Sequence, residues 1–133
     1  KVRRLHEPFV LVAGYGQTGR MLGRSLDALG RRVVVVDIDP ARIDELDLEA
    51  FCADVPGLAA DARNPEHLVL AGLGHRRLES VIALTNDDEA NLAVTMAAAL
   101  LRPEVPVVAR TVSPEIATVL PNSSFAPVFD ALR

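Results

Sequence analysis

The chain has 133 residues, of which half are apolar and 24% are charged, and its formal net charge is −4. This size predicts one soluble globular domain with one sizeable core. The negative charge excludes the basic footprint typical of nucleic-acid-binding domains. The single cysteine, Cys52, excludes an internal disulfide and a cysteine-rich zinc site, and it indicates a reduced, intracellular compartment.

No apolar run approaches the roughly 20 residues that span a bilayer, and no signal peptide is visible. The chain begins with the basic segment Lys1-Val2-Arg3-Arg4 and not with methionine. We therefore expect a lead-in or linker over residues 1–7, a domain over residues 8–133, and a longer parent protein. Any membrane part would lie outside this sequence.

Apolar runs alternate with helical patterns along the first half of the chain. Buried strands are predicted where the runs are short or β-branched, and helices where apolar positions recur at helical spacing between Gly, Asn and Pro boundaries. The predicted elements are strand Phe9–Ala13, helix Gln17–Leu29, strand Val33–Val36, a helix from Pro40 to about Ala50, a weak strand Gly57–Ala60, and a helix from Pro65, capped by Asn64, to about Gly72.

The second half continues the alternation. Strand Ser80–Leu84 is followed by a helix to about Leu101, in which Asn86 is the predicted cap and Glu89 completes a capping box. The remaining predicted elements are strand Val105–Ala109, a helix from Pro114 to about Leu120, and strand Ser124–Val128. This order predicts an α/β fold, a Rossmann-like, doubly wound, parallel six-stranded sheet in three layers. Right-handed crossovers then place all strand carboxyl ends on one edge.

A glycine loop joins the first strand to the first helix, with the sequence Gly14-Tyr15-Gly16-Gln17-Thr18-Gly19. Gly14 allows the tight turn, Gly16 lets a pyrophosphate approach the backbone, and Gly19 lets the helix pack close to the strand. The helix N-terminus offers free N–H groups to phosphates. The loop follows a strand, opens a helix and has an acid 18 residues after its last glycine, which is the context of a dinucleotide site. A glycine turn without a ligand is the alternative.

The second strand ends in Asp37-Ile38-Asp39, beside the predicted phosphate site. The Asp37 carboxylate can accept hydrogen bonds from both ribose hydroxyls, and its charge disfavours the 2′-phosphate of NADP. Asp39 can share this role or merely cap the helix that begins at Pro40. Arg31 and Arg32 precede the strand, so we expect them at its other end.

Further candidates follow the third and fourth strands, on the same edge. Asp61 can hydrogen-bond an adenine amino group and Ala62 can pack against the ring, although Asp61 can equally be a plain loop acid. Thr85 and Asn86 can face the ligand. The acids at residues 87–89 are expected first as partners of the helix dipole.

Arg110 ends the fifth strand, where a guanidinium can bind a phosphate. A surface salt bridge with Glu115 or Asp130 is the alternative. The three histidines of the chain are scattered and form no ligand pair or triad.

Catalytic groups are not evident in the sequence. The only tyrosine, Tyr15, lies inside the glycine loop and the only lysine is Lys1, so the Tyr-x-x-x-Lys pair of short-chain dehydrogenases is absent. No nucleophile elbow, histidine-based triad or metal cluster appears. We therefore predict no catalytic residue, no metal and no enzymatic activity.

The span from about Phe9 to Val128 resembles the TrkA-N domain, also called the RCK (regulator of potassium conductance) N-terminal domain. The matching stretches are Val-Ala-Gly-Tyr-Gly-Gln-Thr-Gly at 12–19, Val-Val-Asp-Ile-Asp at 35–39, Ala-Asp-Ala at 60–62, Ala-Leu-Thr-Asn-Asp-Asp-Glu-Ala-Asn at 83–91, and Val-Ala-Arg at 108–110. The stretch at 83–91 is the specific one, because general dinucleotide folds lack it.

The resemblance implies a cytoplasmic domain at the inner face of the cell membrane that forms dimers or rings. Such domains bind NAD(H), AMP, ADP or ATP and gate an attached or associated potassium channel or transporter. It further implies that Asp61 lies near adenine, that Arg110 lies near phosphate, and that helices around Ala90–Leu101 and Pro114–Leu120 form the dimer contact.

The sequence departs from some members of the family. Arg110 and Val112 stand where calcium-gated members carry carboxylates, so no calcium site is predicted. We also do not expect the C-terminal ligand-binding subdomain of many members within residues 1–133. Two other interpretations stay open: a cofactor-binding fragment of an NAD-dependent oxidoreductase or ligase, and a ligand-free dimerisation scaffold.

Overall fold

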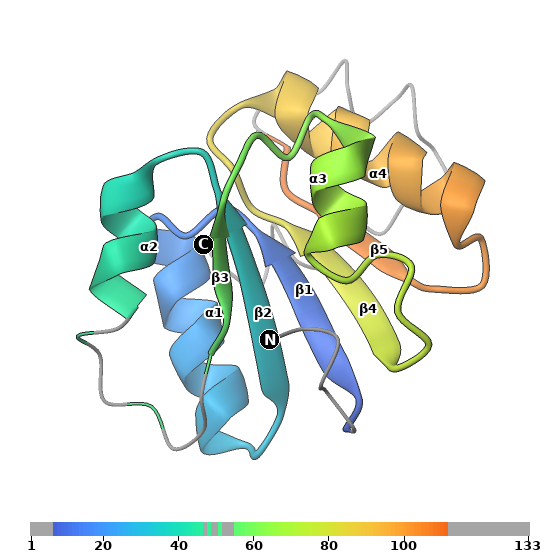
Figure 1. The fold of residues 1–133 in the computed structure, drawn as a ribbon. Coiled ribbons are helices and arrows are strands. Elements are labelled where there is room, and N and C mark those ends of the chain that lie inside the picture. The colour runs from blue at the N-terminus through green and yellow to red at the C-terminus, as the bar shows by residue number, and fades with distance from the viewer. Residues whose placement is uncertain (1–6, 47, 49–50, 52–54, 112–133) are drawn as a thin grey trace.

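Strands and helices alternate along the chain in the computed structural model, which describes residues 7–46, 48, 51 and 55–111 (Figure 1). The strands are β1 (Phe9–Ala13), β2 (Arg32–Asp37), β3 (Gly57–Ala59), β4 (Leu78–Ala83) and β5 (Val107–Ala109). The helices are α1 (Gln17–Ala28), α2 (Pro40–Leu46), α3 (Pro65–Leu70) and α4 (Asp88–Leu101).

The five described strands form one parallel sheet in the order β3-β2-β1-β4-β5. The strand order reverses between β1 and β4, so the chain has a topological switch point there. In open parallel sheets, ligands bind beside the strand carboxyl ends at such a point. The strands of this sheet all point toward the same edge in Figure 1.

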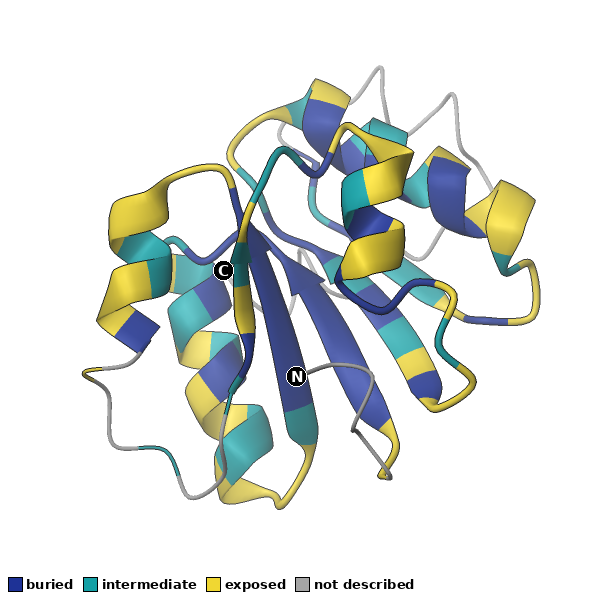
Figure 2. Ribbon diagram, viewed as in Figure 1, coloured by how far each residue is buried: buried dark blue, intermediate teal, exposed yellow. Residues whose placement is uncertain are grey.

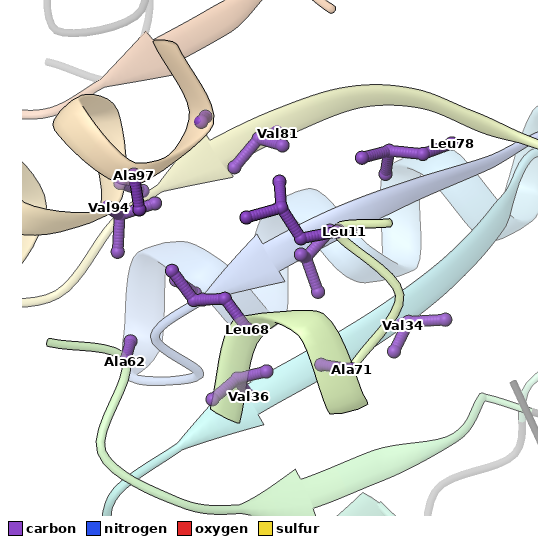
Figure 3. Close-up of a cluster of buried hydrophobic side chains, with 14 of the residues drawn as sticks. Leu11, Val34, Val36, Ala62, Leu68, Ala71, Leu78, Val81, Val94 and Ala97 are labelled. Atoms are coloured by element: carbon purple, nitrogen blue, oxygen red, sulfur yellow. The ribbon is translucent and has the colours of Figure 1, made fainter. Parts of the chain in front are cut away.

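Two apolar clusters lie on opposite faces of the sheet and give the fold its three layers. Strand β1 is buried at all five positions, and its side chains alternate between the clusters. One cluster packs Leu11 and Val34 against α3 and α4, as Figure 3 shows, and the other packs Val12 against α1 and α2. Figure 2 shows the same layering, with buried central strands and helices exposed on their outer sides. Burying a valine or leucine contributes about 1.5–3 kcal/mol, so these central strands anchor the site described below.

The predicted α/β class and doubly wound parallel sheet are confirmed. The predicted sixth strand, Ser124–Val128, and the helix Pro114–Leu120 lie outside the described residues. Strand β5 begins two residues later than predicted, at Val107. Pro106 has no N–H for the ladder and Val105 N donates to the turn carbonyl of Arg102 at 3.0 Å, which explains the late start.

The helix caps are partly as predicted. Asn64 caps α3, since its side chain accepts a hydrogen bond from Glu66 N at 3.0 Å, with Pro65 in the first turn. The predicted cap of α4 is wrong: Asp87, and not Asn86, is the N-cap, accepting from Glu89 N at 3.0 Å. Strand β4 ends at Ala83, and Asn86 still belongs to the loop that leads into the helix.

Candidate functional site

The glycine loop closes tightly between β1 and α1. Gly14 has φ of 103°, and a Cβ atom there would lie 2.7 Å from Thr85 N, so only glycine fits. A Cβ atom at Gly19 would lie 2.1 Å from the carbonyl oxygen of Gly14, so the start of α1 rests directly on the loop. Gly16 is the N-cap of α1 and has no side-chain cap, which leaves the first N–H groups of the helix available to an anion.

A pocket of about 260 Å³ opens at the carboxyl edge of the sheet, at the switch point. Most of the predicted site residues line it, namely Gly14, Gly16, Gln17, Thr18, Asp37, Ile38, Ala62, Thr85, Asn86 and Arg110. The other described residues that line it are Val36, Arg42, Leu84 and Ala90. The structure thus brings together residues from the ends of all five described strands, although they are far apart in sequence.

Four predicted site residues do not line this pocket: Tyr15, Gly19, Asp39 and Asp61. The Tyr15 side chain is only 1% exposed and packs in the core, so only its backbone N–H serves the site. Asp39 accepts a hydrogen bond from Ala41 N at 3.0 Å, as the capping interpretation predicted.

Asp37 is the buried carboxylate of the pocket, with 4% of its surface exposed. Its Oδ2 atom accepts from Tyr15 N at 2.7 Å, and its Oδ1 atom accepts from Asp39 N at 2.8 Å. The Arg42 guanidinium lies farther off, with Nη1 at 3.4 Å from Oδ2. Asp37 therefore joins the glycine loop to the β2–α2 turn while it faces the pocket.

Arg42 is a pocket residue that the sequence reasoning missed. Its position five residues after Asp37, in the first turn of α2, is the feature that points to it, because a helix starting at Pro40 turns this residue back toward the strand tip. Arg31 and Arg32, by contrast, lie at the other end of β2, where they pair with Glu79 and Glu7 at 3.1 and 2.9 Å. That prediction is confirmed.

Asp61 and Ala62 have different surroundings. Ala62 is buried and lines the pocket, whereas the Asp61 carboxylate pairs with Arg63 at 2.9 Å. The side-chain hydrogen bonds from Arg63, supported by the Arg63 backbone N–H, hold the pKa of Asp61 below its usual value. The same pair raises the pKa of Arg63.

Asn91 holds the loop after β4 in place and was also missed as a site-forming residue. It is 1% exposed, and its Oδ1 accepts from Thr85 N at 3.0 Å. Its Nδ2 donates to the carbonyl oxygens of Thr85 and Arg110, both at 3.0 Å. One amide thus joins the ends of β4 and β5.

Arg110 lines the pocket from the end of β5, where its backbone N donates to Ala83 O at 2.8 Å. Its guanidinium forms no hydrogen bond or ion pair with the described residues. The alternative partners, Glu115 and Asp130, lie outside the described residues. Among the described residues, the charged side chains on the pocket wall are one carboxylate and two guanidinium groups, and this excess of positive charge suits a phosphate.

Within residues 7–46, 48, 51 and 55–111, no group of three or more His, Cys, Asp or Glu side chains is arranged to hold a metal ion. In the same residues, no helix is long and apolar enough to span a membrane.

A protein-family model of the TrkA-N domain matches residues 10–129. The chain belongs to the TrkA-N family. This confirms the resemblance noted from the sequence, and the match covers the glycine loop and every other predicted site residue.

Relatives of this TrkA-N chain carry names of potassium transport systems. It is 32% identical over 103 residues to "Putative K(+) efflux antiporter KefB" of Alkalimonas amylolytica, covering 77% of this chain and 14% of that protein. It is 34% identical over 104 residues to "Glutathione-regulated potassium-efflux system protein KefC" of Cronobacter sakazakii, covering 78% and 16%. It is 24% identical over 106 residues to "Trk system potassium uptake protein TrkA homolog" of Pyrococcus abyssi, covering 80% and 44%. The chain thus spans less than half the length of these relatives.

Solved structures share the fold. The TrkA-N domain of the inner membrane protein ybaL from Escherichia coli has a TM-score of 0.77 at 23% identity, covering 88% of this chain and 84% of that one. The GsuK channel bound to NAD has a TM-score of 0.74 at 17% identity, covering 92% and 21%. The Kef CTD of Shewanella denitrificans in its AMP-bound form has a TM-score of 0.64 at 25% identity, covering 84% and 63%.

Proposed function

We propose that this TrkA-N chain is a nucleotide-sensing regulatory domain of a potassium channel or potassium transport system. The observation that carries the proposal is the pocket at the switch point. It combines an uncapped helix N-terminus, a buried carboxylate and two guanidinium groups in one wall. These are the partners that a ribose and its phosphates require.

The proposed ligand is NAD(H) or an adenine nucleotide, AMP, ADP or ATP. Its phosphates would lie on the N-terminus of α1 at Gly16, its ribose on Asp37, and its adenine between Ile38 and Ala62. Arg110 would contact a phosphate, and Thr85 and Asn86 would border the ligand. Asp61 lies beside Ala62 in sequence, and we assign it to the adenine edge. The NAD named with GsuK and the AMP named with the Kef CTD support this ligand class.

The proposed mechanism is a population shift. The domain would form a dimer or ring through α4 and the helix expected at Pro114–Leu120, on the cytoplasmic side of the membrane. Nucleotide binding would favour one arrangement of the assembly, which acts on a fused or separate membrane subunit. The ligand can do this only through a difference in its affinity for the two arrangements. The transport names of the relatives support this partner.

Calorimetry on the isolated chain with NAD, NADH, AMP, ADP and ATP tests the proposal. We expect at least one to bind, and we expect Asp37→Asn to weaken it, because the ribose hydroxyls lose a charged acceptor. The matched control is Asp44→Asn, on the exposed side of α2. Absence of binding by all five at millimolar ligand contradicts the proposal. Equal affinities for wild type and Asp37→Asn would remove Asp37 from the site.

Sedimentation with and without the bound nucleotide tests the regulatory step. We expect the nucleotide to change the proportion of dimer or the shape of the dimer. Potassium flux in cells lacking the gene, complemented with wild type or Asp37→Asn, links this change to transport. Identical flux from both, at equal expression, would contradict gating by the nucleotide.

A further inference from the structure

The guanidinium of Arg42 lies between the two parts of the pocket assigned to sugar and phosphate. Its Nη1 atom is 3.4 Å from Asp37 Oδ2, and its Nε atom is 4.0 Å from Asp39 Oδ2. On its other side, a Cβ atom at Gly16 would lie 3.5 Å from Nη1. The side chain is 41% exposed, so it reaches the pocket from the solvent side.

Arg42 is the weakest of the three partners of the Asp37 carboxylate. The backbone N–H groups of Tyr15 and Asp39 donate at 2.7 and 2.8 Å, whereas the Arg42 contact is 3.4 Å long. If the guanidinium leaves, the buried carboxylate keeps both short hydrogen bonds. The arginine is therefore the partner that a ligand can displace at the lowest cost.

We propose that Arg42 recognises the 5′-phosphate of the nucleotide, an inference that rests on the proposed function. On binding, the ribose hydroxyls take the place of the guanidinium on Asp37, and the guanidinium turns to the phosphate over Gly16. A nucleoside without a phosphate would displace Arg42 and offer it no partner. Arg42 thus makes the pocket selective for phosphorylated ligands, because a guanidinium binds phosphate oxygens in a planar, charge-assisted geometry.

The test compares dissociation constants of AMP, NAD, adenosine and adenosine 2′-monophosphate for wild type and Arg42→Met. Methionine keeps the aliphatic stem and removes the charge. We expect the affinity of Arg42→Met for AMP or NAD, whichever wild type binds more tightly, to fall about 10- to 100-fold. This is the usual effect of losing a hydrogen bond to a charged group. Adenosine is expected to change less than about threefold. Arg42→Lys, which keeps the charge, should retain part of the lost affinity.

The matched control is Arg20→Met. Arg20 lies one turn into α1, pairs with Glu45 of α2, and does not line the pocket. A phosphorus NMR titration of bound AMP adds a readout that a purely structural role would not move. The Arg42 charge should lower the pKa of the bound phosphate, so this pKa should rise in Arg42→Met and stay unchanged in Arg20→Met.

Four results would overturn the inference. If Arg42→Met weakens the binding of AMP and of adenosine equally, Arg42 has a structural role. If its effect on AMP binding is no larger than that of Arg20→Met, Arg42 is not part of the site. If Arg42→Met selectively loses the binding of adenosine 2′-monophosphate, Arg42 contacts a 2′-phosphate and not the 5′-phosphate. Failure of wild type to bind any of NAD, NADH, AMP, ADP and ATP would contradict the proposed function itself, and this inference with it, before any variant is compared.

Discussion

Replacing Asn91 with alanine should destabilise the domain by about 3 kcal/mol. The side chain is almost fully buried, and its loss removes the partners of Thr85 N, Thr85 O and Arg110 O. An unpaired buried backbone group costs about 1–3 kcal/mol. We use about 1 kcal/mol for each of the three groups, since Thr85 is only half-buried and pocket water can reach the loop. This is a large part of the 5–15 kcal/mol typical of a domain.

Urea unfolding at neutral pH, with circular dichroism as the probe, measures this free energy. Asn91→Asp provides a sharper version, because it preserves the volume but places a carboxylate oxygen against the carbonyl oxygens of Thr85 and Arg110, both 3.0 Å away. We expect this variant to lose at least as much as Asn91→Ala at neutral pH. It should recover part of the loss in acid, where the protonated carboxyl again donates a hydrogen bond.

The matched control is Asn86→Ala, in the same loop. Asn86 is exposed and does not cap α4, so its loss should change the free energy of unfolding by less than about 0.5 kcal/mol. The reasoning is refuted if Asn91→Ala lies within about 1 kcal/mol of wild type. It is equally refuted if Asn91→Asp is more stable than Asn91→Ala at neutral pH.

Three further predictions concern other parts of the domain. Gly19→Ala should lower the melting temperature strongly, because its Cβ would meet Gly14 O at 2.1 Å, whereas Gly16→Ala should melt close to wild type. The free energy of unfolding of Asp61→Asn should fall less than that of wild type as the pH falls from about 5 to about 3. The reason is that a carboxyl whose pKa is lowered in the folded state stabilises the protein only while it is ionised. Urea midpoints of wild type and variant that fall by the same amount across this range would contradict this. Arg102→Met should cost about 1–3 kcal/mol in urea unfolding, since Nη1 donates to two carbonyl oxygens before β4, at 3.0 and 2.8 Å; an unchanged midpoint would contradict it.

Local patterns sufficed to predict the sheet and the centre of the pocket. The β-branched run Val33–Val36 favours a strand and the glycine loop favours a tight turn. Both preferences are local and need no contact with distant residues. Asp37 could be placed because it ends a strand, and the carboxyl ends of parallel strands all lie on one edge of the sheet. The places of these residues follow from local backbone geometry, so the spacing of residue types along the sequence is enough to predict them.

Residues whose role depends on tertiary contacts could not be placed in the same way. Asn91 bonds across to Arg110, which is 19 residues away. Arg42 faces the pocket only because α2 packs back along β2. Asn86 and Asp87 are both good caps, and the choice between them depends on where β4 ends. The direction of the Tyr15 side chain, into the core beside α1, is set by the space that Gly23 leaves there.

The contact between Gly14 and the loop after β4 determines how this pocket can respond to a ligand. It joins the β3-β2-β1 half of the sheet to the β4-β5 half at the switch point, with so little space that a single added carbon would lie 2.7 Å from Thr85 N. Because the two halves of the sheet are in such close contact at this point, we expect them to respond to a ligand as one unit. We therefore expect a bound ligand to act on the Arg42 side of α2, where the arginine side chain is 41% exposed.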